Sequence, residues 1–193
     1  MEVMGIEVHL NDEVTDLKQF KKCPVIIATG AAPRYLRSVP GYKKMVEACD
    51  FLNGAEVGET VAVIGGGLTG CEIAYELALN GKKPLIVEMK DDLVSQKGVC
   101  LANSSYLREW FALNEVPVYL ETALKEVKDG AIVCTAKDGS ELELPCDSVI
   151  SCAGYIPAPA FKKGGKVQLV GDCVEVGNLR SVIWRAYEAA MKI

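Results

Sequence analysis

The sequence is poor in the residues that build metal sites and local redox pairs. His9 is the only histidine, and none of the eight cysteines lies in a C-x-x-C pair. The chain therefore offers no histidine cluster for a metal, no zinc or iron–sulfur spacing and no thioredoxin-type disulfide in local sequence. Most cysteines lie within apolar runs, which predicts buried free thiols and favours a reducing compartment or an anaerobe. We accordingly predict no metal site.

Long hydrophobic runs and an excess of positive charge are also absent. No apolar stretch approaches the ~20 residues of a membrane span, and no signal-peptide layout opens the chain. The formal net charge of −5 argues against nucleic acid or an anionic membrane surface as a partner. Half of the 193 residues are hydrophobic and 24% are charged, so both a core and a charged surface can form. These features predict a cytoplasmic protein.

One stretch, residues 60–88, carries the most information, and its sequence is TVAVIGGGLTGCEIAYELALNGKKPLIVE. Its first five residues form a β-branched run typical of a strand buried on both faces. Gly65, Gly67 and Gly70 follow in the G-x-G-x-x-G spacing. In this pattern the first glycine allows a tight turn, the second lets a pyrophosphate approach the backbone, and the third lets the helix lie close to the strand. The order predicts a dinucleotide-binding turn.

The residues after the glycines complete the unit. A helix is expected over 68–80, with its free N–H groups and positive dipole end facing the phosphates. A second strand, 85–87, ends in Glu88, about 20 residues beyond the glycines. Glu88 is placed to accept hydrogen bonds from an adenosine ribose and to repel a 2′-phosphate, which favours NAD(H) over NADP(H). Three lysines lie close enough in sequence to weaken that preference: Lys82, Lys83 and Lys90. The alternative interpretation is that the glycines serve helix packing only and that Glu88 is a solvated strand end.

Further elements are predicted on both sides of this unit. Strands are expected at 5–10, 24–29, 116–120, 147–152 and 167–170. Helices are expected at 15–20, 42–52 and 180–192, with another capped by Asn103 or Ser104. Three alternating runs, at 124–127, 131–135 and 141–144, are separated by two D-G pairs. They predict an inserted β-meander.

Two similar strand-to-loop crossings, ATGAAP at 28–33 and CAGYIP at 152–157, bracket the nucleotide unit. They suggest that a domain spanning 57–146 is inserted into another. The predicted fold class is therefore α/β, with a Rossmann-like parallel sheet, helices on both faces and the inserted meander. A second dinucleotide-binding fold, incomplete in this chain, would flank it.

Three motifs together resemble the C-terminal part of NADH:flavin oxidoreductases: GGGLTGCEIAYELALNGKKPLIVEM, the crossings ATGAAPR and CAGYIP, and VGDCVEVGNLRSVIWRAYEAA. The similarity covers essentially the whole chain and points to 2,4-dienoyl-CoA reductases, trimethylamine dehydrogenases, and enoate or bile-acid reductases. In that family an N-terminal barrel holds FMN and an iron–sulfur cluster, and a C-terminal pair of dinucleotide folds holds FAD and pyridine nucleotide. The resemblance implies an NAD(H)-binding domain at 57–146. It also implies that 1–56 and 147–193 are an N-terminal remnant and a C-terminal part of an FAD-binding domain.

The resemblance also implies roles for individual residues. At the pyridine nucleotide the matching positions are Gly65, Gly66, Gly67, Leu68, Thr69, Gly70, Glu72, Glu88, Met89, Lys90, Ala153 and Gly154. Glu72 matches a glutamate that can lie near the nicotinamide. At FAD the matching positions are Thr29, Gly30, Gly171, Asp172, Arg180 and Val182. Asp172 would hold the ribityl chain, and the helix opening at Arg180 would direct its positive end at the flavin ring. Gly171-Asp172 is also compatible with a simple turn.

The chain departs from the family pattern at its start. No strand, glycine turn and helix precede Gly5, and the sequence has no barrel and no cluster motif. We therefore expect a fragment that binds NAD(H), retains no FAD, and self-associates through surfaces that a missing barrel and flavin module would cover. FMN and the iron–sulfur cluster would belong to the missing region. In the parent oxidoreductase this chain would place NADH for hydride transfer to FAD. We name no catalytic side chain, because the hydride chemistry belongs to the cofactors. A non-catalytic, ADP-type binding module is the rival interpretation, and a methyltransferase is a weaker third.

Overall fold

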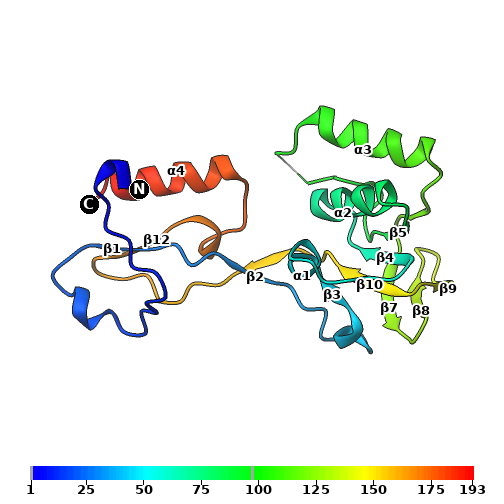
Figure 1. The fold of residues 1–193 in the computed structure, drawn as a ribbon, viewed down its shortest axis with the longest axis horizontal. Coiled ribbons are helices and arrows are strands. Elements are labelled where there is room, and N and C mark those ends of the chain that lie inside the picture. Colours follow the sequence, from blue (N-terminus) through cyan, green and yellow to red (C-terminus); the bar gives the residue numbers. More distant parts are fainter. Residues whose placement is uncertain (1, 97) are drawn as a thin grey trace. The chain divides into compact units, whose positions relative to one another are not determined.

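The structure, a computed structural model, describes residues 2–96 and 98–193 and divides into two compact units. The core unit is Ala32–Ile156, and the terminal unit combines Met1–Ala31 with Pro157–Ile193. The chain passes between them twice, at strands β2 (Ala31–Pro33) and β11 (Tyr155–Pro157), which pair with each other (Figure 1). The core unit is wider than the predicted insertion at 57–146, because its central sheet takes a strand from each side of that range.

The core unit is built on a five-stranded parallel sheet with the order β3-β10-β4-β5-β6. Its strands are β3 (Val46–Glu47), β10 (Ser148–Ser151), β4 (Thr60–Ile64), β5 (Lys83–Val87) and β6 (Val118–Tyr119). The sequence predicted all of these except β3. Strand β4 lies inside the sheet, and four of its five residues are buried. A β-branched run without polar alternation is what a strand covered on both faces requires.

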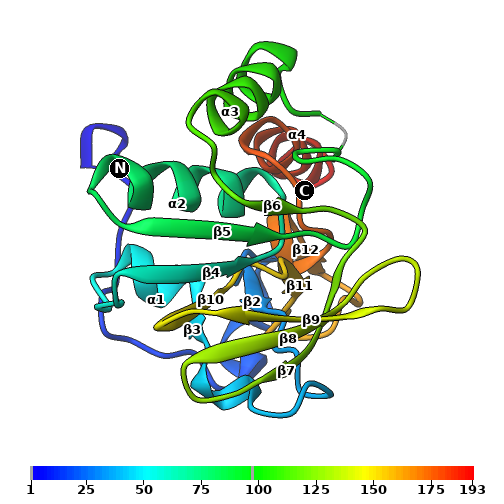
Figure 2. The same ribbon diagram turned by 90° about the vertical axis from the view of Figure 1, so that its right-hand side faces the viewer.

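The two faces of this sheet are covered differently (Figure 2). Val61, Val63 and Ile86 belong to a buried cluster on the face covered by helices α1 (Ala48–Leu52), α2 (Leu68–Leu79) and α3 (Leu101–Leu113). Ala62 and Ile64, their neighbours along β4, belong to a second cluster that includes Ile132 and Cys134 of the meander. Successive side chains of a strand point to opposite faces, so one strand serves both clusters. The second face is thus covered by the meander and the 3-10 turn η3 (Tyr42–Lys44). This differs from the sequence prediction, which expected α-helices on both faces.

The predicted meander is confirmed. Strands β7 (Ala123–Val127), β8 (Ala131–Thr135) and β9 (Glu141–Pro145) pair antiparallel in chain order. The two connecting turns contain Gly130 and Gly139, with φ of +78° and +83°. Such left-handed positions favour glycine, which is why the D-G pairs were a good signal.

The terminal unit has much less regular structure. Strand β1 (Val25–Ile27) pairs in parallel with β12 (Val167–Leu169), and helix α4 (Leu179–Ala190) closes the chain. Its other regular elements are three 3-10 turns, η1 (Glu2–Met4), η2 (Leu17–Phe20) and η4 (Gly171–Cys173), and the remaining residues are mostly irregular. Among the described residues of this unit, the buried apolar side chains are Ile27, Val170, Cys173 and Ala189. In the described part of the chain, no helix is long and apolar enough to cross a membrane.

Three secondary-structure predictions were wrong. Residues 5–10 are exposed and irregular, because no other strand pairs with them. The expected helix over 42–52 is instead η3, β3 and the five-residue α1. Helix α3 begins at Leu101 with Cys100 as its N-cap, so Asn103 and Ser104 lie in its first turn. In that turn the Ser104 hydroxyl donates a hydrogen bond to the Leu101 carbonyl, at 3.0 Å, and caps nothing.

Candidate nucleotide-binding site

The glycine turn joins β4 to α2 so tightly that two of its glycines admit no side chain. Gly65 has φ of +111°, and a Cβ there would lie 2.4 Å from the Cys152 carbonyl oxygen. A Cβ on Gly70 would lie 1.9 Å from the carbonyl oxygen of Gly65 itself. Glycine at 70 therefore lets the first turn of α2 pack directly on the end of β4. For these two positions the packing interpretation is sufficient.

Gly67 is different, because its surroundings are open. It is the N-cap of α2 and has no side chain with which to cap the helix. The nearest atoms to a Cβ built there belong to the Gln96 carboxamide, at 3.6 and 3.8 Å. Within the described residues, the N–H groups of Leu68, Thr69 and Gly70 donate no hydrogen bond. The N-terminus of α2 thus presents free donors and the positive end of its dipole, which is the environment that a phosphate requires.

Glu88 lies beside this turn, held by four hydrogen bonds. Its N–H donates to the Tyr119 carbonyl and its carbonyl accepts from the Thr122 N–H, both at 2.9 Å. One carboxylate oxygen accepts from the Gly66 N–H at 2.6 Å, and the other accepts from the Lys90 N–H at 2.8 Å. Glu88 is half-buried and aimed at the glycine turn, so it is not a freely solvated strand end. Each carboxylate oxygen keeps a second lone pair for another donor.

A loop after β5 also packs on the glycine turn, a contact that the sequence analysis did not predict. The Val94 N–H donates to the Gly66 carbonyl at 2.8 Å, with Val94 at a φ of +48° that is unfavourable for a β-branched residue. Leu93 is buried, and its Cδ2 lies 2.5 Å from where a Gly66 Cβ would be. Arg108 on α3 donates two hydrogen bonds to the Leu93 carbonyl and pairs with Asp92 at 2.8 Å. The guanidinium therefore holds the loop in place over the turn.

The remaining predicted residues of the core unit surround this corner with different exposures. Leu68 packs partly into the core, Thr69 is half-buried in the first turn of α2, and Glu72 is exposed one turn later. Met89 is 74% exposed. The Lys90 N–H donates to the Glu88 carboxylate, whereas the Lys90 side chain is exposed. The last two of these residues, Ala153 and Gly154, follow β10, the strand beside β4.

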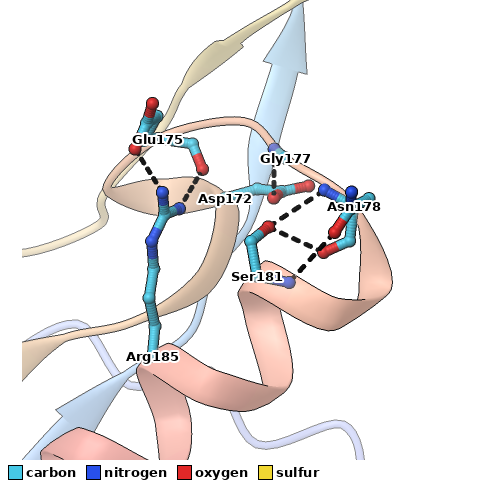
Figure 3. Close-up of polar contacts among 6 residues, drawn as sticks. All are labelled: Asp172, Glu175, Gly177, Asn178, Ser181 and Arg185. Carbon is cyan, nitrogen blue, oxygen red and sulfur yellow. Dashed lines mark hydrogen bonds and ion pairs between the residues drawn. The ribbon is translucent and has the colours of Figure 1, made fainter. Parts of the chain in front are cut away.

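In the terminal unit the predicted residues form a second group around the start of α4 (Figure 3). Gly171 has φ of +68°, and its nearest neighbour is Cγ1 of Val182, 3.6 Å from a Cβ built on the glycine. One Asp172 carboxylate oxygen accepts from the Gly177 N–H at 3.1 Å. Asn178, not Arg180, caps α4, in a capping box with Ser181. The helix therefore begins at Leu179, one residue before the position expected from the sequence, and Arg180 is exposed in its first turn.

Two further contacts stabilise this loop. Arg185 donates a hydrogen bond to the Glu175 carbonyl at 2.5 Å and also pairs with its carboxylate (Figure 3). Elsewhere in the unit, the Thr29 hydroxyl donates to the Ala158 carbonyl at 3.0 Å and accepts from the Ala160 N–H at 3.1 Å. Gly30, at φ of +77°, accepts from the Ala158 N–H. Thr29 and Gly30 thus bind the two crossing segments of the chain to each other.

The cysteines are free thiols, as predicted, but only Cys71, Cys134, Cys146 and Cys173 are buried, so the expectation that nearly all would be buried was wrong. Burial, reinforced by the Glu88 charge, raises the pKa of Cys71 to about 12. Burial, reinforced by Glu47, likewise raises the pKa of Cys152 to about 12. Both thiols are therefore protonated at neutral pH and behave as small apolar side chains. No group of three or more metal-ligating side chains occurs in residues 2–96 and 98–193.

Comparison with known families gives one domain match. The family described as pyridine nucleotide-disulphide oxidoreductase matches residues 6–176. Among characterised proteins, cinnamate reductase from Clostridium sporogenes is 33% identical over 98% of this chain and 30% of its own length. NADH oxidase from Thermoanaerobacter brockii is 28% identical over 88% of this chain and 28% of its own length.

Solved structures give the same result. A 2-naphthoyl-CoA reductase, solved as its 2-naphthoyl-CoA complex, superposes with a TM-score of 0.85 and 25% identity, covering all of this chain and 30% of that protein. Bacillithiol disulfide reductase from Bacillus cereus has a TM-score of 0.62 at 18% identity, over 77% of this chain and 52% of its own, which is a likeness of fold alone. The chain spans about 30% of the length of cinnamate reductase, NADH oxidase and 2-naphthoyl-CoA reductase.

Proposed function

Because the chain belongs to the pyridine nucleotide-disulphide oxidoreductase family, we propose that its core unit binds NADH at the glycine turn and places it for hydride transfer to a flavin. Cinnamate reductase and 2-naphthoyl-CoA reductase tie the chain to the enoate reductase type of NADH:flavin oxidoreductases. The hydride transfer would take place in a longer parent enzyme, since the chain spans about 30% of these relatives.

One observation supports this proposal most strongly: the open N-terminus of α2 lies beside a fixed carboxylate. The unpaired N–H groups of Leu68, Thr69 and Gly70 would bind the pyrophosphate. Glu88 would accept hydrogen bonds from the adenosine ribose, with its orientation set by the Gly66 and Lys90 N–H groups. Bound NADH supplies the hydride, and the chain's own residues bind and orient it. No side chain is needed as a general acid or base.

The fit to FAD is only partial. In the terminal unit, Gly171, Asp172 and the start of α4 offer the elements that would face a flavin's ribityl chain and ring. In the part of this unit that the structure describes, β1 and β12 are the only strands that lie wholly within it, and neither is followed by a G-x-G-x-x-G turn that leads directly into an α-helix. The pyrophosphate of FAD would therefore lack a helix N-terminus.

We accordingly expect the chain to purify colourless and to bind NADH without retaining FAD. An absorption spectrum of the purified protein, with and without added FAD followed by desalting, measures this directly. Flavin retained at near one-to-one stoichiometry would contradict it.

The preference for NADH over NADPH tests the role of Glu88. We expect NADPH to bind about tenfold more weakly than NADH, a difference of about 1.4 kcal/mol, because the carboxylate repels a 2′-phosphate. Glu88→Gln should bring the two affinities together, and Glu109→Gln, on the exposed side of α3, should leave the difference unchanged. Isothermal titration calorimetry gives all the affinities, with thermal melting as a check on folding. Equal affinities for the two nucleotides in the unmodified protein would argue against Glu88 as the ribose ligand.

A nucleotide-binding module without hydride transfer is the second candidate. It is favoured by the terminal unit, whose described part offers only some of the elements of a flavin site. Such a module would bind ADP as tightly as NADH. Calorimetric affinities for the two ligands would separate the candidates, because only a site built for NADH gains affinity from the nicotinamide half.

A further inference from the structure

The peptide group between Leu93 and Val94, in the loop after β5, connects helix α3 to the glycine turn. Its carbonyl accepts two hydrogen bonds from Arg108, from Nε at 2.9 Å and from Nη2 at 2.5 Å. Its N–H, which belongs to Val94, donates to the Gly66 carbonyl at 2.8 Å. Hydrogen bonds in such a series polarise one another, so a charged donor at one end strengthens the bond at the other. Arg108 therefore acts on Gly66 through the intervening peptide group.

Gly66 extends this series of hydrogen bonds to Glu88. The glycine is buried, and its carbonyl also accepts from the Cys71 thiol at 3.4 Å. Its N–H donates to one Glu88 carboxylate oxygen at 2.6 Å. Both groups belong to one residue, so a displacement of the Gly66 carbonyl also moves the N–H that orients the carboxylate. The series thus runs from the guanidinium on α3 to the proposed ribose ligand.

The Arg108 side chain is itself fixed in position. It is 31% exposed and pairs with Asp92 at 2.8 Å, and a carboxylate oxygen of Asp92 accepts from the Leu93 N–H at 2.8 Å. A planar guanidinium can bind a carboxylate and a carbonyl at once, which the single ammonium of a lysine does less well. Burial and the Glu88 charge raise the pKa of the Cys71 thiol, and the Arg108 charge lowers it. Both ends of the series therefore act on the same buried thiol.

The loop needs these contacts because its conformation is unfavourable by itself. Val94 has φ of +48°, a left-handed value that crowds a β-branched side chain. A residue keeps such a conformation only where its surroundings determine it. Leu93 and Val94 are buried, at 4% and 3% exposed, and the two hydrogen bonds from Arg108 fix the peptide group that directly precedes the Val94 φ angle. Without Arg108, the loop loses the polar part of this support.

We propose that Arg108 is a positioning residue for the nucleotide: through the 93–94 peptide group and Gly66, it fixes the Glu88 carboxylate in the orientation that receives the adenosine ribose. The inference rests on the proposed function and adds to it a residue on α3 that acts only through other protein groups. The N–H groups proposed to bind the pyrophosphate donate no hydrogen bond to this loop within the described residues. Arg108 therefore governs the choice between NADH and NADPH more than it governs phosphate binding.

Arg108→Met tests this on the full chain, by calorimetric titration with NADH and with NADPH. The change removes the charge and the donors but keeps a long side chain. We expect the NADH affinity to fall about fivefold and the NADPH affinity to fall less than about twofold, because only NADH gains from a correctly oriented carboxylate. Arg37→Met removes the same charge from an exposed position of the core unit and is the matched control. It should leave both affinities unchanged.

A double-mutant cycle with Glu88→Gln separates positioning from general stability. If Arg108 acts through the Glu88 carboxylate, Arg108→Met should cause little further change in the NADH to NADPH ratio of the Glu88→Gln protein. A merely structural role would lower both affinities by the same factor in both backgrounds. Arg108→Lys keeps the charge and one donor, so it should lose about twofold in the ratio and carries the test if thermal melting shows that Arg108→Met does not fold.

The outcomes distinguish this inference from the proposed function. A selective loss of NADH affinity that disappears in the Glu88→Gln background would support the positioning role. Equal losses for the two nucleotides, no loss, or a change in ratio that persists without the carboxylate would overturn it, and the proposed function would stand. An unmodified protein that binds neither nucleotide would overturn both.

Discussion

The core and terminal units use the same local patterns but reach different degrees of burial. In each unit a short strand leads into a glycine-containing crossing: β10 leads into 152–157 and β1 into 28–33. Each unit also has an acidic residue beside a glycine, Glu88 beside Gly66 in the core unit and Asp172 after Gly171 in the terminal unit. In the core unit, β4 has a paired strand on each side and apolar clusters on both faces. In the terminal unit, β1 pairs only with β12 among the described residues, and one of its three residues is buried.

The difference shows that the surroundings, more than the local pattern, determine whether an element becomes part of a core. Helix α4 is amphipathic, yet Ile183, Trp184 and Tyr187 are each more than half exposed. On α3 of the core unit, Leu107 and Phe111 are buried by neighbouring elements. Burial of apolar area contributes most of the stability of a fold. We therefore expect the core unit to be the more stable of the two, and three experiments test that comparison.

The largest effect should come from the closest contact in the core unit. Gly70→Ala would place a Cβ 1.9 Å from the Gly65 carbonyl oxygen, so either α2 or the glycine turn must move. We expect a loss of about 3 kcal/mol or more in the free energy of unfolding. Urea denaturation followed by circular dichroism measures it.

Gly164→Ala in the terminal unit is the matched control. A Cβ there meets no atom within 4 Å, so the change should stay within about 0.5 kcal/mol. A Gly70→Ala protein as stable as the unmodified one would show that the turn tolerates a side chain, and would contradict the tight packing of α2 on β4.

The second-largest effect should be a difference in labelling rate between exposed and less accessible cysteine thiols. Burial raises the pKa of Cys134 to about 11, and Cys71 and Cys152 have pKa values of about 12, so their thiolate fractions at pH 8 are minute. Cys23 of the terminal unit and Cys100 of the core unit are exposed. We expect iodoacetamide to label the two exposed cysteines at least about a hundredfold faster than Cys71, Cys134 and Cys152, whose pKa values are raised.

Mass spectrometry of peptides from the labelled native protein gives these rates residue by residue, and labelling in urea supplies the reference for full access. Rapid native labelling of Cys71 or Cys152 would mean that the core around the glycine turn opens readily. The comparison between the two units would then lose its basis.

The smallest effect concerns the exposed face of α4. We propose that the chain self-associates through this face, because apolar side chains gathered on a helix surface favour contact with another apolar surface. Replacing Ile183, Trp184 and Tyr187 together by serine should weaken association about tenfold or more, as judged by sedimentation velocity over a concentration series. Leu113→Ser, at the exposed end of α3, is the control and should have little effect. A protein that stays monomeric at all concentrations would contradict the proposal.

Local chemistry made much of the core unit predictable. The β-branched run at 60–64 became β4, the helical spacing after it became α2, and the two D-G pairs became the turns of the meander. Gly81, expected to end the helix, has φ of +77° directly after the C-cap Asn80. The resemblance to NADH:flavin oxidoreductases was confirmed by the cinnamate reductase and 2-naphthoyl-CoA reductase matches.

Contacts between distant segments could not be predicted in this way. No local pattern indicates that Arg108 holds the loop after β5, or that the Gly66 N–H donates to Glu88. Strand β3 is two residues long and was hidden inside a helical pattern, so the pairing that puts Glu47 opposite Ser151 could not be foreseen. The strand expected at 5–10 failed for the opposite reason, since alternation alone supplies no pairing strand.

The sequence by itself determined the elements whose conformation depends on their own residues: the glycine turn, the helix that starts there and the D-G hairpins. These follow from backbone freedom and local hydrogen bonding, which act over a few residues. Only the tertiary structure decided which polar groups share the edge of the sheet and which apolar faces are covered. Those outcomes depend on strand order and on burial by segments far away in the chain, and neither is encoded within a local window.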